Sequence, residues 1–208
     1  MRSFLLRTAM VVWAFLGGAM PVFSMETVKE PGTKIEFPVI ASFRYQGAEH
    51  VLRLTGAALR RKFFFKIYAM AHYMEDGKEK SSAEALHAVL TDGKAKQIVI
   101  EYVRFFGGDK MRDTLREGFQ KNTTPAEYRE IRPVADPFCD YFGDKAIRNH
   151  DRAVLRWLAG GTVVAIFNGK EIATIRNRVF ARALWSIWFG DQPVVNRERL
   201  IQRMIQGP

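Results

Sequence analysis

Apolar and polar positions alternate along residues 52–75, on both sides of a basic turn. Residues 52–55 alternate between leucine and polar side chains, a period of two that is typical of a half-buried strand. Three cations follow at Arg60–Lys62, and residues 63–74 then form a second apolar-rich segment. The pattern predicts a hairpin of two strands that are joined through a basic turn.

The second strand of this hairpin has two faces, because successive side chains of a strand point to opposite sides. One face carries Phe63, Phe65, Ile67, Ala69, Ala71 and Tyr73, and the other carries Phe64, Lys66, Tyr68, Met70, His72 and Met74. The second face is otherwise apolar, so its three polar side chains indicate a cavity that is filled by water or by a ligand. An ordinary sandwich strand with a solvated edge would give the same pattern.

Further strands are predicted where the alternation returns. They are residues 34–44, 97–106, 152–158, 162–167 and 170–175. The first of these is interrupted by Pro38, which favours a sheet edge. Asn168-Gly169 is the strongest hairpin signal in the chain.

Helices are predicted where apolar residues recur every three or four positions. They are residues 83–90 with Ser82 as the cap, a helix opening at Gly107-Gly108-Asp109, a stretch after Thr124-Pro125, one around residues 180–188, and residues 196–204. We expect Pro133 and Pro137 to divide the third helix into two short pieces. Strands and helices thus come in runs, so the predicted fold class is α+β, an antiparallel sheet with a layer of helices on one face.

The first 24 residues have the pattern of a secretory signal peptide. Arg2 and Arg7 precede a short apolar run, and Ser24 offers a small residue for cleavage. The run is short for a membrane span and is interrupted by glycine and proline, although an uncleaved anchor is the alternative. We therefore expect cleavage after Ser24 and a periplasmic or secreted protein, with residues 25–208 forming a single domain.

The formal net charge is +10, and removal of Arg2 and Arg7 would leave 30 basic against 22 acidic residues, or +8. Such a charge favours anionic partners, either small amphipathic anions or an anionic membrane surface. Neither a zinc-finger spacing nor a basic-aromatic module is present, so no nucleic-acid partner is expected. Oligomeric state does not follow from the sequence.

The remaining chemistry-bearing residues give no catalytic or metal motif. Cys139 is the only cysteine and lies in an aromatic stretch, where a buried small side chain is expected. The four histidines show no metal-ligand spacing, and no serine lies in a nucleophile motif. We expect neither a metal nor a cofactor.

Several segments together resemble the chalcone isomerase-like superfamily. The central motif is Gly56-x-x-x-Arg60, followed by Lys66-Ile67-Tyr68-Ala69 and Tyr73. Residues 188–194, Trp-Phe-Gly-Asp-Gln-Pro-Val, resemble the closing signature of that superfamily. The resemblance covers roughly residues 31 to 206 and rests on the order and spacing of its motifs. It implies a large sheet with a helical layer.

The resemblance also implies two candidate activities. In chalcone isomerases an arginine holds a phenolate while a threonine and a tyrosine help to polarise a ketone; here Arg60 matches the arginine, and Tyr68 replaces the threonine. The stretch that matches the position of the tyrosine, residues 108–111, contains none. An intramolecular lyase of this type is therefore the alternative function.

A tyrosine in place of the threonine is similar to the fatty-acid-binding branch, where the resemblance implies a carboxylate clamp of Arg60 and Tyr68. The guanidinium binds a carboxylate bidentately and the hydroxyl adds one donor. The full set of candidate ligand-binding residues is Arg60, Tyr68, Lys66, His72, Tyr73, Phe64 and Met70. A solvated arginine at the hairpin tip is the competing interpretation of Arg60.

The predicted function is thus an exported protein that binds a fatty acid or a similar small amphipathic anion. The alternatives are the isomerase and a non-catalytic envelope protein whose role is protein contact. If the protein were an isomerase, Arg60 and Tyr68 would be its catalytic residues.

Overall fold

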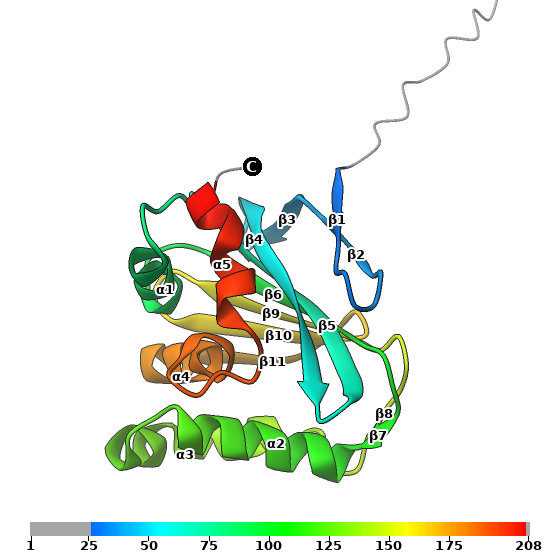
Figure 1. Ribbon diagram of the computed structural model, residues 1–208. Helices are drawn as coiled ribbons and strands as arrows, with labels where there is room; N and C mark the ends of the chain where they lie inside the picture. Colours follow the sequence, from blue (N-terminus) through cyan, green and yellow to red (C-terminus); the bar gives the residue numbers. More distant parts are fainter. Residues whose placement is uncertain (1–25, 207–208) are drawn as a thin grey trace, which may run out of the picture.

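The computed structural model describes residues 26–206. The predicted signal peptide, residues 1–24, lies outside them. A curled seven-stranded antiparallel sheet in the order β11-β10-β9-β6-β5-β4-β3 forms the centre of the fold, and helices cover one of its faces (Figure 1). This arrangement confirms the predicted α+β class.

The strands differ widely in length. They are β1 (Thr27–Lys29), β2 (Glu36–Pro38), β3 (Ile40–Tyr45), β4 (Ala48–Lys62), β5 (Phe65–Met74), β6 (Lys96–Tyr102), β7 (Phe106–Gly107), β8 (Ala146–Ile147), β9 (Arg152–Leu158), β10 (Thr162–Phe167) and β11 (Lys170–Arg176). The segment with Pro38 forms two strands, and β3 is an edge of the sheet as predicted. The strand predicted over 97–106 ends at Tyr102, after which the chain leaves the sheet.

The helices are α1 (Ser82–Leu90), α2 (Gly108–Lys121), α3 (Pro125–Asp140), α4 (Arg178–Phe189) and α5 (Arg197–Gln206). Two details of the sequence prediction were wrong. The cap of α1 is Ser81, which accepts a hydrogen bond from the Glu84 amide, one residue before the predicted Ser82.

The second error concerns α3, which continues through Pro133 and Pro137 as one helix. Each proline removes one hydrogen bond from the helix interior. A complete capping box between Thr124 and Glu127 stabilises the start of the helix. Its inner stripe is buried in the larger core, where α3 packs against α2 and α4, and this tertiary packing outweighs the local preference of proline.

Two cores lie on the two faces of the sheet. The larger core, between the sheet and the helices, contains Trp157, Trp185 and Phe180. The smaller core, on the other face, contains Phe37 and Leu52. Partly buried residues of the β1–β2 hairpin pack at its edge. Alternate residues of β5 enter different cores, as the period of two predicts.

None of the helices within residues 26–206 combines the length and the apolar character that crossing a bilayer requires.

Candidate functional site

A cavity of about 240 Å³ lies where the β4–β5 hairpin meets the end of β6 and the start of α2. Its lining residues are Arg60, Lys62, Ile67, Tyr68, Tyr102, Arg104, Phe105, Phe106, Lys110, Met111, Thr114 and Glu117. Aromatic and aliphatic side chains form much of the wall, and four cations surround it. A wall of this kind suits a ligand with an apolar body and an anionic group.

Arg60 and Tyr68 lie side by side in this cavity, because they are register partners across the β4–β5 ladder. Directly opposed residues of an antiparallel pair present their side chains to the same face. The structure therefore brings together the two residues of the predicted clamp. Arg60 is partly buried and does not point freely into solvent at the hairpin tip.

The segment after α4 holds both side chains in place. One guanidinium nitrogen of Arg60 donates to the Val194 carbonyl oxygen, and the Trp188 indole N–H donates to the Tyr68 hydroxyl oxygen at 2.9 Å. Trp188 and Val194 belong to the closing signature of the sequence. The signature thus contributes to the site by orienting the arginine and the tyrosine.

Two phenols in the cavity stay protonated at neutral pH. Burial raises the pKa of Tyr68 to about 12, although the Trp188 hydrogen bond and the Arg60 charge oppose the shift. Burial, together with Tyr68 and Asp151, holds the pKa of Tyr102 well above its usual value. Because the Tyr68 oxygen accepts from Trp188, its own O–H is free to donate into the cavity. Tyr102 directs its O–H toward the Met111 sulfur at 3.8 Å.

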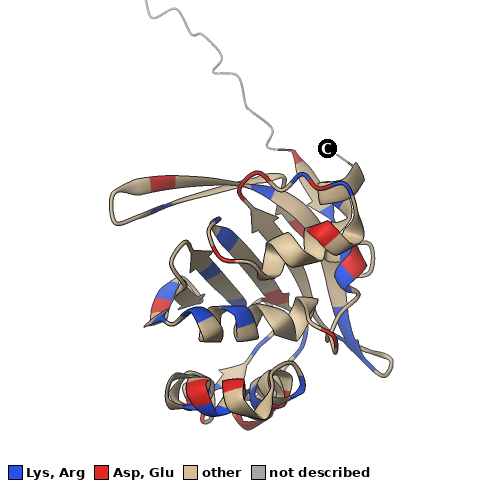
Figure 2. Cartoon of the chain, turned by 90° about the vertical axis from the view of Figure 1, so that its left-hand side faces the viewer, with Lys and Arg blue, Asp and Glu red and all other residues tan. Residues whose placement is uncertain are grey.

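The electrostatic character of the cavity is positive. Arg60, Lys62, Arg104 and Lys110 line it together with one carboxylate, Glu117. Glu117 is paired with Lys121 at 2.6 Å, and that hydrogen bond, with the Lys62 and Lys110 charges, lowers the pKa of Glu117. Figure 2 shows that Lys and Arg also occupy the β4–β5 hairpin close to its tip. An anion is therefore favoured at this cavity.

Two residues that were predicted on the cavity face lie elsewhere. The register of β4 and β5 shifts so that Tyr68 pairs with Arg60 and Lys66 pairs with Arg61, which leaves Ile67 as an extra residue. Such a bulge reverses the alternation beyond it. Lys66 consequently turns to the other side, where its ammonium group donates to the Gly32 carbonyl at 2.6 Å. Phe64 is 80% exposed in the turn and lines no cavity wall.

The other three candidates are core residues. Met70 is buried in the core between the sheet and the helices and does not line the cavity. Tyr73 is buried in the core on the opposite face. His72 is fully buried and contacts Thr55 and Trp185. Of the seven predicted residues, Arg60 and Tyr68 are brought together in the cavity.

The sequence analysis did not identify most of the other residues that line the cavity. Tyr102 and Arg104 carried a signal, since they share one face of the segment that pairs with Tyr68. Lys110 and Met111 occupy the helix start at which the resemblance placed a family tyrosine. Phe105 and Phe106 gave no signal, because their contribution depends on the chain leaving the sheet after Tyr102.

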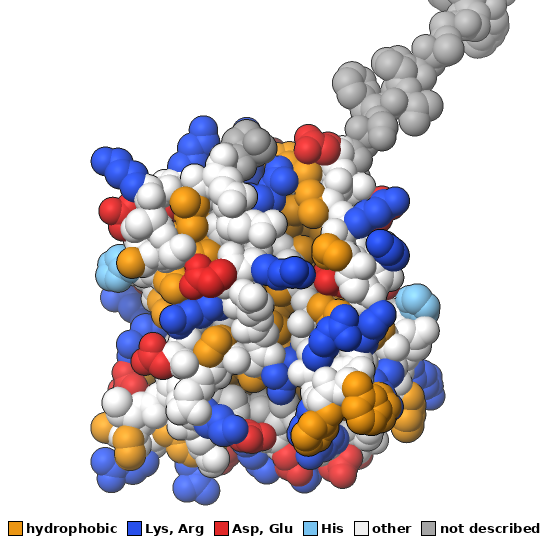
Figure 3. All heavy atoms as spheres, in the orientation of Figure 1, with side chains coloured by type: hydrophobic (Ala, Val, Ile, Leu, Met, Phe, Trp, Pro, Cys, Tyr) orange, Lys and Arg blue, Asp and Glu red, His pale blue; other side chains and the backbone are white. Residues whose placement is uncertain are grey.

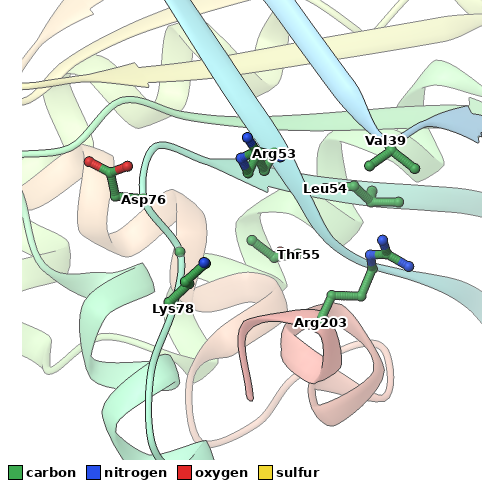
Figure 4. A pocket seen from close by; sticks show the side chains of 8 residues that line it. Val39, Arg53, Leu54, Thr55, Asp76, Lys78 and Arg203 are labelled. Atoms are coloured by element: carbon green, nitrogen blue, oxygen red, sulfur yellow. The ribbon is translucent and has the colours of Figure 1, made fainter. Parts of the chain in front are cut away.

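A second cavity, of about 540 Å³, lies at the other end of β4 beside α5. Arg53, Lys78 and Arg203 surround it with Asp76, and Figure 4 shows Arg203 extending from α5 toward β4. Its apolar lining comes from Val39 and Leu54 beside the buried Thr55, and it includes no aromatic side chain. The Arg60–Tyr68 cavity has more apolar and aromatic side chains in its wall, so it is the better candidate for a ligand with an apolar body.

Within residues 26–206, no group of three or more histidine, cysteine or acidic side chains is arranged to hold a metal ion. Cys139 is buried, and burial raises the pKa of its thiol to about 12. The thiol is therefore unsuited to act as a nucleophile.

Comparisons with known proteins agree with this fold. A family model described as chalcone isomerase-like matches residues 38–204. A crystal structure of an Arabidopsis thaliana fatty-acid binding protein is similar, with a TM-score of 0.68 at 15% sequence identity, over 87% of this chain and 98% of that one. No curated protein matches the sequence.

Proposed function

This chain belongs to the chalcone isomerase-like family, and from that premise we propose that it binds a fatty acid or a similar small amphipathic anion between Arg60 and Tyr68. The observation that carries the proposal is the pairing of a partly buried guanidinium with a neutral phenol beside an aromatic wall. The fatty-acid binding protein of similar fold supports the choice of ligand class.

In this arrangement the carboxylate lies at Arg60, whose second terminal nitrogen is available because the first is bonded to Val194. Tyr68 adds its O–H as a directional donor. The alkyl chain lies against Phe105, Phe106 and Met111, where each buried methylene contributes about 0.8 kcal/mol. The cavity of about 240 Å³ is slightly below the usual range for ligand sites, so a medium-length chain fits better than a long one.

Replacing Arg60 by alanine should weaken laurate binding by roughly ten- to a hundredfold. The reason is the loss of a charge-assisted hydrogen bond, worth about 1.5–3 kcal/mol. Tyr68→Phe should cost less, because it removes one neutral donor. Calorimetric titration with laurate and with dodecanol, a neutral ligand of equal length, measures these changes. Dodecanol binding should depend little on Arg60.

Two matched controls locate the binding. Arg61 is the next residue but lies near Gly32, on the opposite face, so Arg61→Ala should change laurate affinity by less than about threefold. Arg53→Ala tests the larger cavity in the same way. Equal losses for Arg60, Arg61 and Arg53 variants would mean general attraction to a basic surface and would contradict the clamp.

The alternative function, an intramolecular lyase acting on an unsaturated ketone, predicts turnover of a chalcone. We expect none above the spontaneous rate, because Tyr68 replaces the threonine of the isomerases and no tyrosine lies at the start of α2. Loss of chalcone absorbance with time measures ring closure. A protein-dependent rate that Arg60→Ala abolishes would establish the lyase instead.

We also propose that the protein is exported, on the basis of the sequence pattern of residues 1–24. Intact mass of the protein from a fractionated cell should correspond to a chain that begins at Met25, recovered from the periplasm. A full-length chain in the membrane fraction would contradict cleavage after Ser24.

A further inference from the structure

The tip of the β4–β5 hairpin exposes three consecutive phenylalanines. Phe63 is 85% exposed, Phe64 is 80% exposed and Phe65 is 44% exposed, and Phe105 beside them is 65% exposed. Figure 3 shows hydrophobic side chains gathered at the lower right of the molecule, over this tip, with Lys and Arg around them. Contiguous exposed apolar groups, unlike single ones, mark interaction sites.

Turn stability does not account for these residues. Phe63 has a φ of 52°, in the left-handed region where glycine and asparagine are favoured and a bulky side chain is strained. The Phe64 and Phe65 rings contact each other at an interplanar angle of 46°, with centroids 4.3 Å apart, yet Phe64 remains in solvent. The turn therefore carries large apolar groups at a cost in local stability.

Positively charged side chains lie next to the aromatic tip. Arg61, Lys62 and Lys66 lie on the hairpin, and the Arg104 guanidinium stacks over the Phe65 ring at 4.3 Å. Apolar side chains at an extremity with Lys and Arg just behind them match the profile of a membrane surface, where rings enter the acyl boundary and cations meet lipid phosphates.

We propose that this tip docks on an anionic lipid bilayer. Phe63 and Phe64 enter the interface, while Arg61 and Lys66 contact the headgroups. A bilayer fits better than a folded partner because the apolar groups form a protruding tip and the cations surround it. Lys62, Arg104 and Phe105 belong to both the tip and the cavity wall, so docking would place the cavity beside the membrane surface.

Docking itself does not depend on the proposed ligand, whereas direct transfer of an anionic lipid or fatty acid between bilayer and cavity rests on the proposed function. The two can be tested separately, because the outermost residues, Phe63 and Phe64, do not line the cavity.

Vesicle co-sedimentation tests the docking, with vesicles of phosphatidylglycerol and phosphatidylcholine compared with phosphatidylcholine alone. The wild type and all variants should be expressed and purified in the same way, so that they share the same N-terminus. The wild type should prefer the anionic vesicles. The double variant Phe63→Ser/Phe64→Ser should bind them at least tenfold more weakly. Arg61→Glu should bind roughly tenfold more weakly and respond less to salt.

Matched controls come from the opposite end of β4. Val51 is 54% exposed there, and Arg44 lies on β3 beside it, so Val51→Ser and Arg44→Glu change the same properties away from the tip. Both should retain vesicle binding. Equal binding by wild type and tip variants would overturn the proposal, as would self-association that depends on the phenylalanines without any vesicle binding.

Laurate titration in the absence of vesicles separates the two functions. The double variant should keep its laurate affinity within about twofold, and Arg60→Ala should still bind vesicles at low salt. Loss of laurate binding in Arg60→Ala with normal docking supports both ideas. If the wild type bound laurate normally but did not bind vesicles, the docking proposal would be wrong and the laurate-binding proposal would stand.

Discussion

Substitution of Gly56 by alanine should destabilise the protein by about 3 kcal/mol or more. A Cβ atom at this position would lie 2.7 Å from the carbonyl carbon of Leu200 and 2.9 Å from its Cα, so it would collide with the backbone of α5. Backbone atoms cannot move aside as the end of a flexible side chain can, so the whole of α5 would have to shift away from β4. That movement would expose the buried residues Leu200, Ile201 and Met204, and overpacking of this kind costs several kcal/mol.

Urea unfolding of the wild type and the variant measures the effect. Gly143→Ala is the matched control, because a Cβ there would meet the Asp140 carbonyl oxygen at 3.3 Å and the Arg112 side chain at 3.6 Å. Gly143→Ala should change the free energy of unfolding by less than about 1 kcal/mol. If Gly56→Ala changed it equally little, the close approach of α5 to β4 would be contradicted.

The second large effect is a loss of stability in acid that originates at His72. The Trp185 indole only donates, so His72 Nε2, 3.3 Å away, must accept. Nδ1 therefore carries the proton and donates to the Thr55 hydroxyl at 2.7 Å, while that hydroxyl donates to the Leu200 carbonyl at 2.7 Å. The neutral imidazole satisfies the whole network, and a second proton would face the indole N–H.

Burial, with a smaller contribution from the Lys96 charge, lowers the pKa of His72 to about 3 from 6.5. Below pH 6.5 the unfolded chain binds a proton that the folded protein does not bind. The stabilisation is therefore fully present above pH 6.5 and is lost as pH falls toward 3, by up to about 1.4 kcal/mol per pH unit. Between pH 7 and pH 5 the loss amounts to about 2 kcal/mol.

Unfolding free energies at pH 7 and pH 5 test this slope. His72→Gln removes the titrating group but keeps a donor and an acceptor, so its stability should fall less steeply with acid than that of the wild type. The exposed His87 provides the control His87→Gln, which should retain the wild-type slope. Identical slopes for the wild type and His72→Gln would mean that His72 does not stay neutral in the folded protein.

The sequence determined the features that depend on short-range geometry. The period of two placed Tyr68 and Met70 on the helical side of β5 and Tyr73 on the other side. Asn168-Gly169 predicted the β10–β11 hairpin, and the cap at Thr124 predicted the start of α3. These features are fixed by neighbouring residues, through side-chain alternation, positive φ and capping hydrogen bonds, so the pattern alone carries them.

The tertiary structure decided which of the patterned residues meet. The bulge at Ile67 sent Lys66 away from Tyr68, because one extra residue reverses a strand's faces and no local pattern records it. Val194 and Trp188, more than a hundred residues away, fixed Arg60 and Tyr68 toward the cavity. His72 shares the predicted face but is enclosed by α4 and α5, since burial depends on contacts between distant segments. The sequence thus supplied the arginine and the tyrosine, and long-range packing brought them together in one cavity.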